Sequence, residues 1–299
     1  MPPAQDRMAA IADMQRTLEV SGYIAERDLA ATLLLMADLG RPVLVEGDPG
    51  VGKTEIAKAL ARARDTRLIR LQCFEGLDIH HSLYEWNYQR QLLAIRVAEA
   101  AGPSSLGEDA LFSEKYLLKR PLLESLTQAT PPVLLIDEVD RADEAFEAFL
   151  LEVLSDYQVS IPEMGTIHAT SVPLVVLTSN ATRELSDALR RRCLYHYLSY
   201  PSFAKELAIV QLRLPHMSDR LGRQIVEVAQ ALRQQGLKKQ PGVAETLDWA
   251  AAILGLGVSS LDEAGTDRIR DTLSTLLKTQ EDVRAMEPVM LERLLALAG

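Results

Sequence analysis

The sequence predicts an α/β fold: a mostly parallel β-sheet with helices on both faces, followed by a smaller all-helical domain. Between residues 43 and 200, short apolar runs alternate with longer segments of helical pattern, which is typical of repeated strand–helix units. After Tyr200-Pro201 the strand-like runs stop, and breaks such as Pro241-Gly242 divide a helical pattern. We therefore expect two domains, residues 1–201 with the sheet and residues 202–299 with helices alone.

Each element of this prediction rests on a local pattern. Residues 1–40 carry apolar side chains at helical spacing, and Gly40 and Pro42 end that pattern. Short apolar, partly β-branched runs indicate strands that are buried in a parallel sheet. A helix over residues 55–64 is expected after the loop that follows the first strand. The predicted strands are residues 43–45, 68–71, 133–136 and 174–177.

Composition and charge restrict the classes of function. The chain has 299 residues and a formal net charge of −10, which argues against broad binding to nucleic acid or anionic lipid. Cys73 and Cys193 lie far apart in sequence, so we expect neither a disulfide framework nor a cysteine metal site. The amino-terminal residues have no signal-like apolar core, and no apolar run approaches the ~18 residues of a membrane helix. We therefore expect a cytoplasmic protein without stable membrane insertion.

A glycine-rich turn follows the first predicted strand and fits the pattern G-x-x-x-x-G-K-[ST]. Glycines let backbone N–H groups turn inward around phosphate oxygens, and the next helix adds its positive N-terminal end. Lys53 can reach the outer phosphates, and Thr54 can hold Mg²⁺. A chance glycine turn is the alternative, but strand, loop and helix stand in the order that nucleotide binding requires. The predicted nucleotide-binding residues are Gly47, Asp48, Pro49, Gly50, Val51, Gly52, Lys53, Thr54 and Glu55.

Two acids, Asp137 and Glu138, end the third predicted strand. The carboxyl ends of parallel strands are where ligands bind in such sheets. Asp137 would complete the Mg²⁺ shell, and Glu138 would polarise the water that attacks the γ-phosphate. Alone, such a pair usually marks a strand that enters a solvated loop; beside the glycine-rich turn, the catalytic interpretation is preferred.

Two further features follow the fourth predicted strand. Asn180 could orient the attacking water or touch the γ-phosphate, and a helix N-cap formed by Asn180 or Thr182 is the alternative. Arg190, Arg191 and Arg192 end a predicted helix, where they could simply interact with the helix dipole. Beside two phosphate motifs, an arginine that reaches a neighbouring subunit's nucleotide is the better explanation. Arg192 is the first choice for this catalytic role and Arg190 the second.

The chain resembles an AAA+ ATPase with a P-loop core. It has, in this order, a glycine loop, an acidic strand, an asparagine strand, an arginine cluster and a helical lid. Four segments resemble the MoxR group of that superfamily: GDPGVGKTE, LLIDEVDRADEAFEAFLLEVLSD, VSIPEMGTIHATSVPLVVLTSN and DALRRRC. The stretch QCFEGLDIHHSLYEWNYQRQLL, residues 72–93, resembles its CoxD branch, which is associated with maturation of carbon monoxide dehydrogenase and related molybdenum hydroxylases. The resemblance covers about residues 25–299.

The resemblance implies cofactors, partners and assembly. ATP and Mg²⁺ would be the cofactors, and the chain would form a hexameric ring that remodels a client metalloenzyme. A partner protein with a von Willebrand A-type domain is implied as well. Glu163 would lie on a β-hairpin, and residues 72–95 would contain an inserted loop; both would face a central channel and touch the substrate protein.

Three details stay open. Tyr84, Trp86 and Tyr88 alternate with strand period, and core packing is the alternative to substrate contact. His80 and His81 beside Asp78 could suggest a metal, although a solvated loop is the preferred interpretation. The lid arginine that the family often carries is missing from residues 238–245, where Lys239 could substitute even though lysine and arginine differ at phosphates.

The sequence thus predicts an ATP-hydrolysing remodelling chaperone, and two alternatives remain. A nucleic-acid motor or loader is disfavoured by the acidic net charge and by the absence of a basic stripe. A nucleotide-switched binding module such as a GTPase is disfavoured because no Asn-Lys-x-Asp motif occurs and because Glu138 favours turnover.

Overall fold

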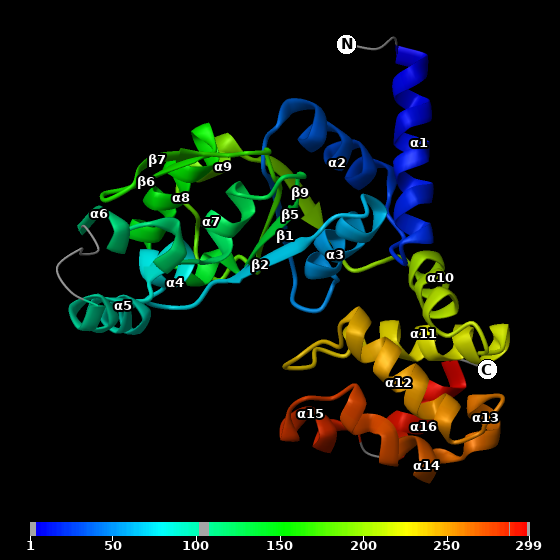
Figure 1. The fold of residues 1–299 in the computed structure, drawn as a ribbon. Helices are drawn as coiled ribbons and strands as arrows, with labels where there is room; N and C mark the ends of the chain where they lie inside the picture. Colours follow the sequence, from blue (N-terminus) through cyan, green and yellow to red (C-terminus); the bar gives the residue numbers. More distant parts are fainter. Residues whose placement is uncertain (1–3, 102–107, 287, 298–299) are drawn as a thin grey trace. The chain divides into compact units, whose positions relative to one another are not determined.

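The computed structural model describes residues 4–101, 108–286 and 288–297 (Figure 1). The chain forms two compact units. The first contains the chain up to Thr17, then Arg27–Glu46 and Ile56–Tyr197. The second contains Leu18–Glu26, Gly47–Glu55 and the chain from Leu198 onward, so the glycine-rich loop is grouped with the carboxyl-terminal helices. The boundary near residue 201 that the sequence predicts stays a prediction.

A five-stranded sheet forms the centre of the first unit, in the order β2-β5-β8-β1-β9. Neighbouring pairs among β2, β5, β8 and β1 are parallel, with Leu68 opposite Val133 and Val43 opposite Val176. The predicted α/β fold and its four predicted strands are confirmed, and each strand extends one or two residues further toward its carboxyl end. The five strands are β1 (Val43–Gly47), β2 (Leu68–Gln72), β5 (Val133–Asp137), β8 (Leu174–Ser179) and β9 (Leu194–Leu198).

Helices cover both faces of this sheet, because successive side chains of a buried strand point to opposite faces. On one face, Leu134 and Ile136 belong to an apolar core with Leu123 of α7 and Leu150 of α8. On the other face lie α2 and α3, as Figure 1 shows. Full burial of such an apolar side chain contributes about 1.5–3 kcal/mol, so the apolar strands hold the layers together. The helices of this part are α1 (Ala4–Val20), α2 (Arg27–Leu39), α3 (Lys53–Ala63), α7 (Pro121–Leu126), the 3₁₀ helix η2 (Val139–Arg141), α8 (Glu144–Asp156) and α9 (Asp187–Arg192).

Two small antiparallel sheets are added to this unit. The first pairs β3 with β4, and the second is a hairpin of β6 and β7 whose turn contains Glu163, as predicted from the resemblance. Gly165 has a φ of 78°, a backbone conformation that favours glycine, at the start of the returning strand. The elements are α4 (Ile79–Ser82), β3 (Tyr84–Trp86), α5 (Tyr88–Ala101), α6 (Glu108–Leu111), η1 (Glu114–Tyr116), β4 (Leu117–Lys119), β6 (Gln158–Ile161) and β7 (Gly165–His168).

The carboxyl-terminal part contains helices and no strand among its described residues, as predicted. Its core surrounds the fully buried Trp249, whose Nε1 donates to Thr272 Oγ1 at 2.8 Å. Ile225, Leu232 and Ile253 belong to the same core. The elements are α10 (Phe203–Arg213), α11 (Asp219–Arg233), α12 (Val243–Gly255), α13 (Leu261–Ala264), α14 (Thr266–Thr272), η3 (Leu273–Thr275), α15 (Gln280–Ala285) and α16 (Pro288–Leu297). Across the described ranges of the chain, no helix has the length and apolar character needed to cross a membrane.

A buried ion pair joins the first three helices of this part. Arg233 on α11 and Glu206 on α10 are 2.6 Å apart, with side chains 6% and 0% exposed. Thr246 on α12 donates to the same carboxylate, and Arg233 also donates to the carbonyl of Pro241 at 2.7 Å. A buried charge is tolerated only when it is paired and hydrogen-bonded, so this network fixes the segment that enters α12.

Candidate nucleotide-binding site

The predicted catalytic acids lie at one edge of the sheet. Because β1, β5 and β8 are neighbouring parallel strands, their carboxyl ends at Gly47, Asp137 and Ser179 reach the same edge. The glycine-rich loop leaves β1 at this edge. Ligands bind at such edges because several chain segments and helix N-termini converge there.

The loop has the backbone conformation that phosphate binding requires. Gly50 and Gly52 have φ angles of 79° and 99°, backbone conformations that residues other than glycine rarely adopt. Gly47 is required for a different reason: a Cβ there would lie 2.1 Å from the carbonyl oxygen of Leu198. Helix α3 begins at Lys53, so its first turn and its positive end face the loop. The conformation therefore supports a loop that binds phosphate oxygens.

Lys53 folds back over the loop. Its side chain is nearly buried, and Nζ donates to the carbonyl oxygens of Gly47 at 2.6 Å and of Asp48 at 2.8 Å. These bonds hold the ammonium group at the start of the loop. Glu55, also counted in the predicted loop, pairs through Oε2 with Arg213 Nη2 at 3.1 Å. The roles of these residues in nucleotide binding stay predictions.

Asp137 is a buried carboxylate with a partner on each oxygen. Its side chain is 4% exposed. Oδ1 accepts from Thr178 Oγ1 at 2.5 Å, and Oδ2 accepts from Arg70 Nε at 3.1 Å and Nη2 at 2.6 Å. Thr178 stands on β8 and Arg70 on β2, the strands on either side of β5, and the sequence interpretation assigned a role to neither. Arg70 had a usable signal, because it is the one charge inside an otherwise apolar predicted strand.

Glu138 is held in an unusual backbone conformation directly after β5. Its φ is 55°, and left-handed backbone at a residue other than glycine costs of order 1 kcal/mol and gathers at functional sites. Its N–H donates to Thr178 Oγ1 at 2.9 Å, so one hydroxyl joins both acids. The carboxylate is 34% exposed and lies 3.0 Å from Arg141 Nη1. A partly exposed carboxylate at this edge suits a base that acts on water.

The segment after β8 is organised by Asp140, which is buried. One oxygen, Oδ2, accepts from the backbone N–H of Asn180 at 3.2 Å and of Thr182 at 2.9 Å. The N-cap alternative for Asn180 and Thr182 is wrong, because α9 begins at Asp187 and Ser186 is its N-cap. Asn180 thus lies at the predicted strand end, and its catalytic role stays a prediction.

The three arginines of α9 differ in their surroundings. Arg190 lies 3.0 Å from the nearly buried Glu46, so it is engaged within its own chain. Arg192 is exposed and donates from Nε to Ser155 Oγ at 2.6 Å, while Arg191 is exposed and lies 3.9 Å from Asp187.

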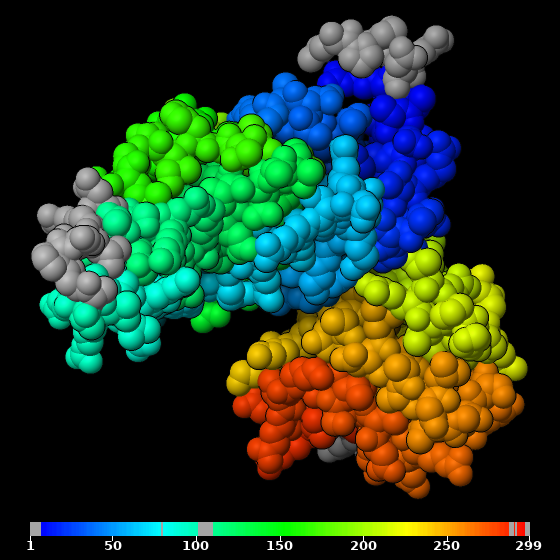
Figure 2. All heavy atoms as spheres, in the orientation of Figure 1, coloured from blue at the N-terminus to red at the C-terminus, as the bar shows by residue number. Residues whose placement is uncertain are grey.

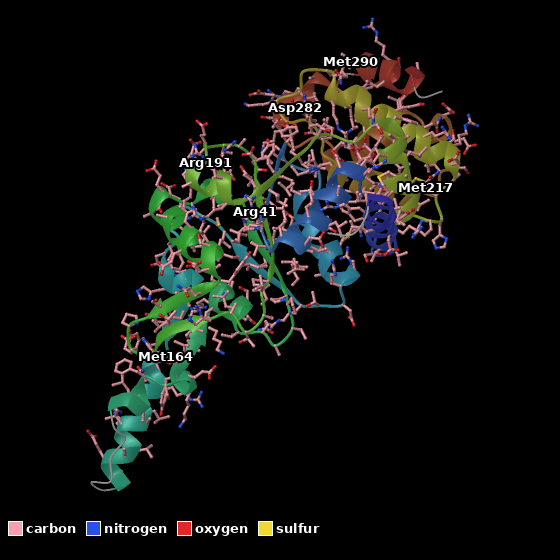
Figure 3. The ribbon with its side chains drawn as sticks, turned by 90° about the horizontal axis from the view of Figure 1, so that it is seen from above. Arg41, Met164, Arg191, Met217, Asp282 and Met290 are labelled. Atoms are coloured by element: carbon pink, nitrogen blue, oxygen red, sulfur yellow. The ribbon has the colours of Figure 1, made fainter. Side chains whose placement is uncertain are left out.

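Arg41 fixes the end of this helix. It donates to the carbonyl oxygens of Arg191 at 2.7 Å and Arg192 at 3.1 Å. Arg41 and Arg191 are both labelled in Figure 3. Carbonyls at a helix end have no partner within the helix, so Arg41 satisfies groups that would otherwise need water. The sequence interpretation missed Arg41. The role of Arg192 or Arg190 at another subunit's nucleotide stays a prediction.

The aromatic residues of the insertion separate into buried and exposed groups. Tyr84 and Trp86 on β3 are buried, so the core-packing alternative is correct for these two. Tyr88 begins α5 and is exposed. Burial, followed by the charges of Glu163 and Tyr88, raises the pKa of Tyr84. His81 Nδ1 lies 2.7 Å from Asp78 Oδ1.

Within residues 238–245, where the family often carries a lid arginine, this chain makes a backbone contact with the glycine-rich loop. The N–H of Val243, at the start of α12, donates to the carbonyl of Gly50 at 2.9 Å. A Cβ on Gly242 would lie 2.6 Å from the Cα of Gly50, so glycine is required at this close approach. Lys239 is exposed, and its N–H donates to Asp282 Oδ2 at 3.2 Å.

The donor set fits Mg²⁺ and a nucleotide. Mg²⁺ prefers carboxylate, hydroxyl and phosphate oxygens, which Asp137, Thr54 and a bound nucleotide would supply. The glycine loop and the first turn of α3 would hold the phosphates. Asp137 has both oxygens already bonded, so a metal near it must share or replace one of these partners.

Comparison with known proteins agrees with this geometry. Residues 43–199 match the ATPase family associated with various cellular activities (AAA). The gas vesicle ATPase GvpN1 of Halobacterium salinarum is 25% identical over 265 residues, which are 83% of this chain and 72% of GvpN1. Chaperone protein ClpB 2 of Thermosynechococcus vestitus is 28% identical over 155 residues, which are 50% of this chain and only 15% of ClpB 2. Among solved structures, the RuvB Holliday junction branch migration motor of Thermotoga maritima has a TM-score of 0.41 at 16% identity, covering 94% of this chain and 71% of that one.

Replacing Lys53 tests the phosphate loop. Lys53→Ala removes the charge that would meet the outer phosphates, and charged hydrogen bonds are worth about 1.5–3 kcal/mol. We expect ATP affinity to fall roughly 10- to 100-fold, measured by calorimetry, with an unchanged circular dichroism spectrum. Lys278→Ala, at an exposed lysine of the carboxyl-terminal part, is the control and should bind ATP normally. Unchanged affinity in Lys53→Ala would remove the loop from the nucleotide site.

Proposed function

The chain belongs to the ATPase family associated with various cellular activities (AAA), and we propose that it couples hydrolysis of Mg²⁺-bound ATP to the remodelling of another protein. The observation that carries this proposal is that β1 leads directly into the glycine loop, while the buried Asp137 and the partly exposed Glu138 stand at the carboxyl end of β5 in the same sheet. The loop and Lys53 bind the phosphates, Thr54 and Asp137 hold Mg²⁺, and Glu138 accepts a proton from the attacking water. The Asn180 side chain orients that water.

The same proposal includes a homo-oligomeric ring, hexameric by resemblance to the AAA+ superfamily. Arg190 is paired with Glu46 of its own chain, whereas Arg192 lies exposed at the end of α9. An arginine in this position supplies positive charge to the γ-phosphate bound by a neighbour, which stabilises the charge that develops during transfer.

An exposed apolar surface supports contact with a client protein. Helix α5, teal in Figure 2, presents Tyr88, Leu92, Leu93 and Val97, each between 60% and 63% exposed. Contiguous exposed apolar residues mark interaction sites on soluble proteins. Glu163 in the β6–β7 turn acts through its charge on Tyr84 of the same insertion, whose pKa it helps to raise. We assign protein contact to these two segments.

The finer assignment follows the resemblance of residues 72–93 to the CoxD branch of the MoxR group. We propose that the client is a molybdenum-containing hydroxylase, which the ATPase opens for cofactor insertion or activation. A protein with a von Willebrand A-type domain is proposed as the partner that links client and ring.

Glu138→Gln tests the base. The amide keeps the size and shape of the side chain but cannot accept the proton, and general base catalysis contributes about 10²- to 10⁴-fold. We expect ATP binding to persist while phosphate release falls by that factor. Glu144→Gln, at an exposed acid on α8, should leave the rate unchanged. A Glu138→Gln protein that hydrolyses ATP at the wild-type rate would place the base elsewhere.

The ATP-bound Glu138→Gln protein also tests the client class. A ring that binds ATP without hydrolysing it should retain a client that wild-type turnover releases. We expect the purified cofactor-free form of a molybdenum hydroxylase to co-purify with Glu138→Gln in ATP, and not with Lys53→Ala. Equal retention by the two variants, or preference for an unrelated unfolded protein, would reject this client class while leaving the ATPase assignment intact.

Mixing two variants tests the arginine in trans. Arg192→Ala should bind ATP, because its own loop is intact, but its hydrolysis rate should fall by about 10³- to 10⁵-fold. Lys53→Ala should be nearly inactive when the ATP concentration is high enough to fill the wild-type site but too low to fill the weakened site of this variant. In a mixed ring, the intact Arg192 of the Lys53→Ala subunit meets the intact loop of an Arg192→Ala subunit, so some hydrolysis should return, with a maximum at an intermediate ratio of the two proteins.

Arg191→Ala is the matched control on the same helix and should keep its activity when assayed alone. If the subunits exchange and no ratio of Arg192→Ala to Lys53→Ala restores hydrolysis, Arg192 does not act between subunits. Collapse of activity in Arg191→Ala instead would transfer the role to Arg191.

A further inference from the structure

The guanidinium of Arg70 lies on the carboxylate that the proposed function assigns to Mg²⁺. Arg70 stands on β2, and Asp137 ends the neighbouring strand β5. Two nitrogens of Arg70 donate to the same oxygen, Oδ2, at 3.1 Å and 2.6 Å. Arg70 also donates to Gln72, the residue directly opposite Asp137 across the two strands. The arginine is therefore held at Asp137 by two partners.

The two side chains differ in exposure, and this difference indicates which one can move. The Asp137 side chain is 4% exposed, and Thr178 fixes its other oxygen at 2.5 Å. The Arg70 side chain is 50% exposed, so its guanidinium can turn into solvent once another cation balances the charge of Asp137. Movement of Arg70 would remove its two hydrogen bonds from Oδ2, while the bond from Thr178 to Oδ1 would remain.

The charges around Asp137 explain why a counter-charge is present. Asp137 is nearly buried, and two further acids, Glu138 and Asp140, follow it within three residues of the chain. A buried carboxylate is tolerated only when it is paired with a cation and hydrogen-bonded. A divalent ion would meet that need, but it would then repel the guanidinium.

We propose that Arg70 is a counter-charge for Asp137 that Mg²⁺ displaces when it binds with nucleotide. Arg70 pairs with Asp137 and holds its orientation until the metal arrives, and the same contact opposes the metal. Arg70 therefore sets the Mg²⁺ concentration at which Mg²⁺ begins to strengthen nucleotide binding. This inference rests on the proposed role of Asp137 beside Mg²⁺.

A Mg²⁺ titration of nucleotide binding tests the inference without any measurement of hydrolysis. The probe is a fluorescent ATP analogue at fixed concentration, with Mg²⁺ raised from an EDTA-treated start. We expect Arg70→Gln to lower the Mg²⁺ midpoint by about five- to tenfold, because competing ligands are coupled by factors of this size. Nucleotide affinity in EDTA should not change. Arg67→Gln, at an exposed arginine paired with Glu124, should show the wild-type midpoint.

Further variants separate the possible failures. If Arg70→Gln does not fold, Arg70→Lys replaces it: one ammonium cannot reproduce the two-nitrogen contact, so the midpoint should fall by a smaller factor. An unchanged or raised midpoint in the folded variant overturns the inference. Asp137→Asn should raise the midpoint if Asp137 acts on the metal. A wild-type midpoint in Asp137→Asn would instead reject the proposed metal role of Asp137 itself.

Discussion

The arrangement at the sheet edge depends on one requirement, that the buried carboxylate of Asp137 be hydrogen-bonded and balanced in charge. Thr178 meets part of this requirement, and its hydroxyl also accepts the N–H of Glu138. The hydroxyl thus links the ends of β5 and β8 and holds Glu138 in its left-handed conformation. Arg70 supplies the charge. Because unpaired buried charges are strongly unfavourable, the two acids are fixed in place by the fold.

Buried carboxylates organise the rest of the first unit in the same way. Glu147 on α8 is almost fully buried, pairs with Arg183, and accepts the N–H of Ser186 at 2.9 Å. It therefore fixes the start of α9. Glu46 pairs with Arg190 near the other end of that helix. The orientation of the arginine cluster is thus set by ion pairs, whose geometry in a low-dielectric interior leaves little freedom.

In the second unit, the contact between the loop and the carboxyl-terminal helices is made by backbone. Arg233 holds the carbonyl of Pro241, which places Gly242 against Gly50 and lets Val243 donate to the loop. The close approach leaves no room for a side chain at Gly242, so the loop and the start of α12 are packed backbone against backbone. This contact joins the glycine loop to the helices without a lid arginine.

The sequence by itself determined the strands, the glycine loop and the acids at a strand end, because apolar runs, glycines and strand termini are local patterns. The β6–β7 hairpin was reached only through the resemblance to a family. Tertiary structure alone decided which polar groups meet. Arg190 reaches Glu46 across 144 residues, and Arg41 reaches the end of α9 across 150. Such pairs follow from the order of strands in the sheet, and burial then decides which charges must pair. No local pattern in the sequence contains that order.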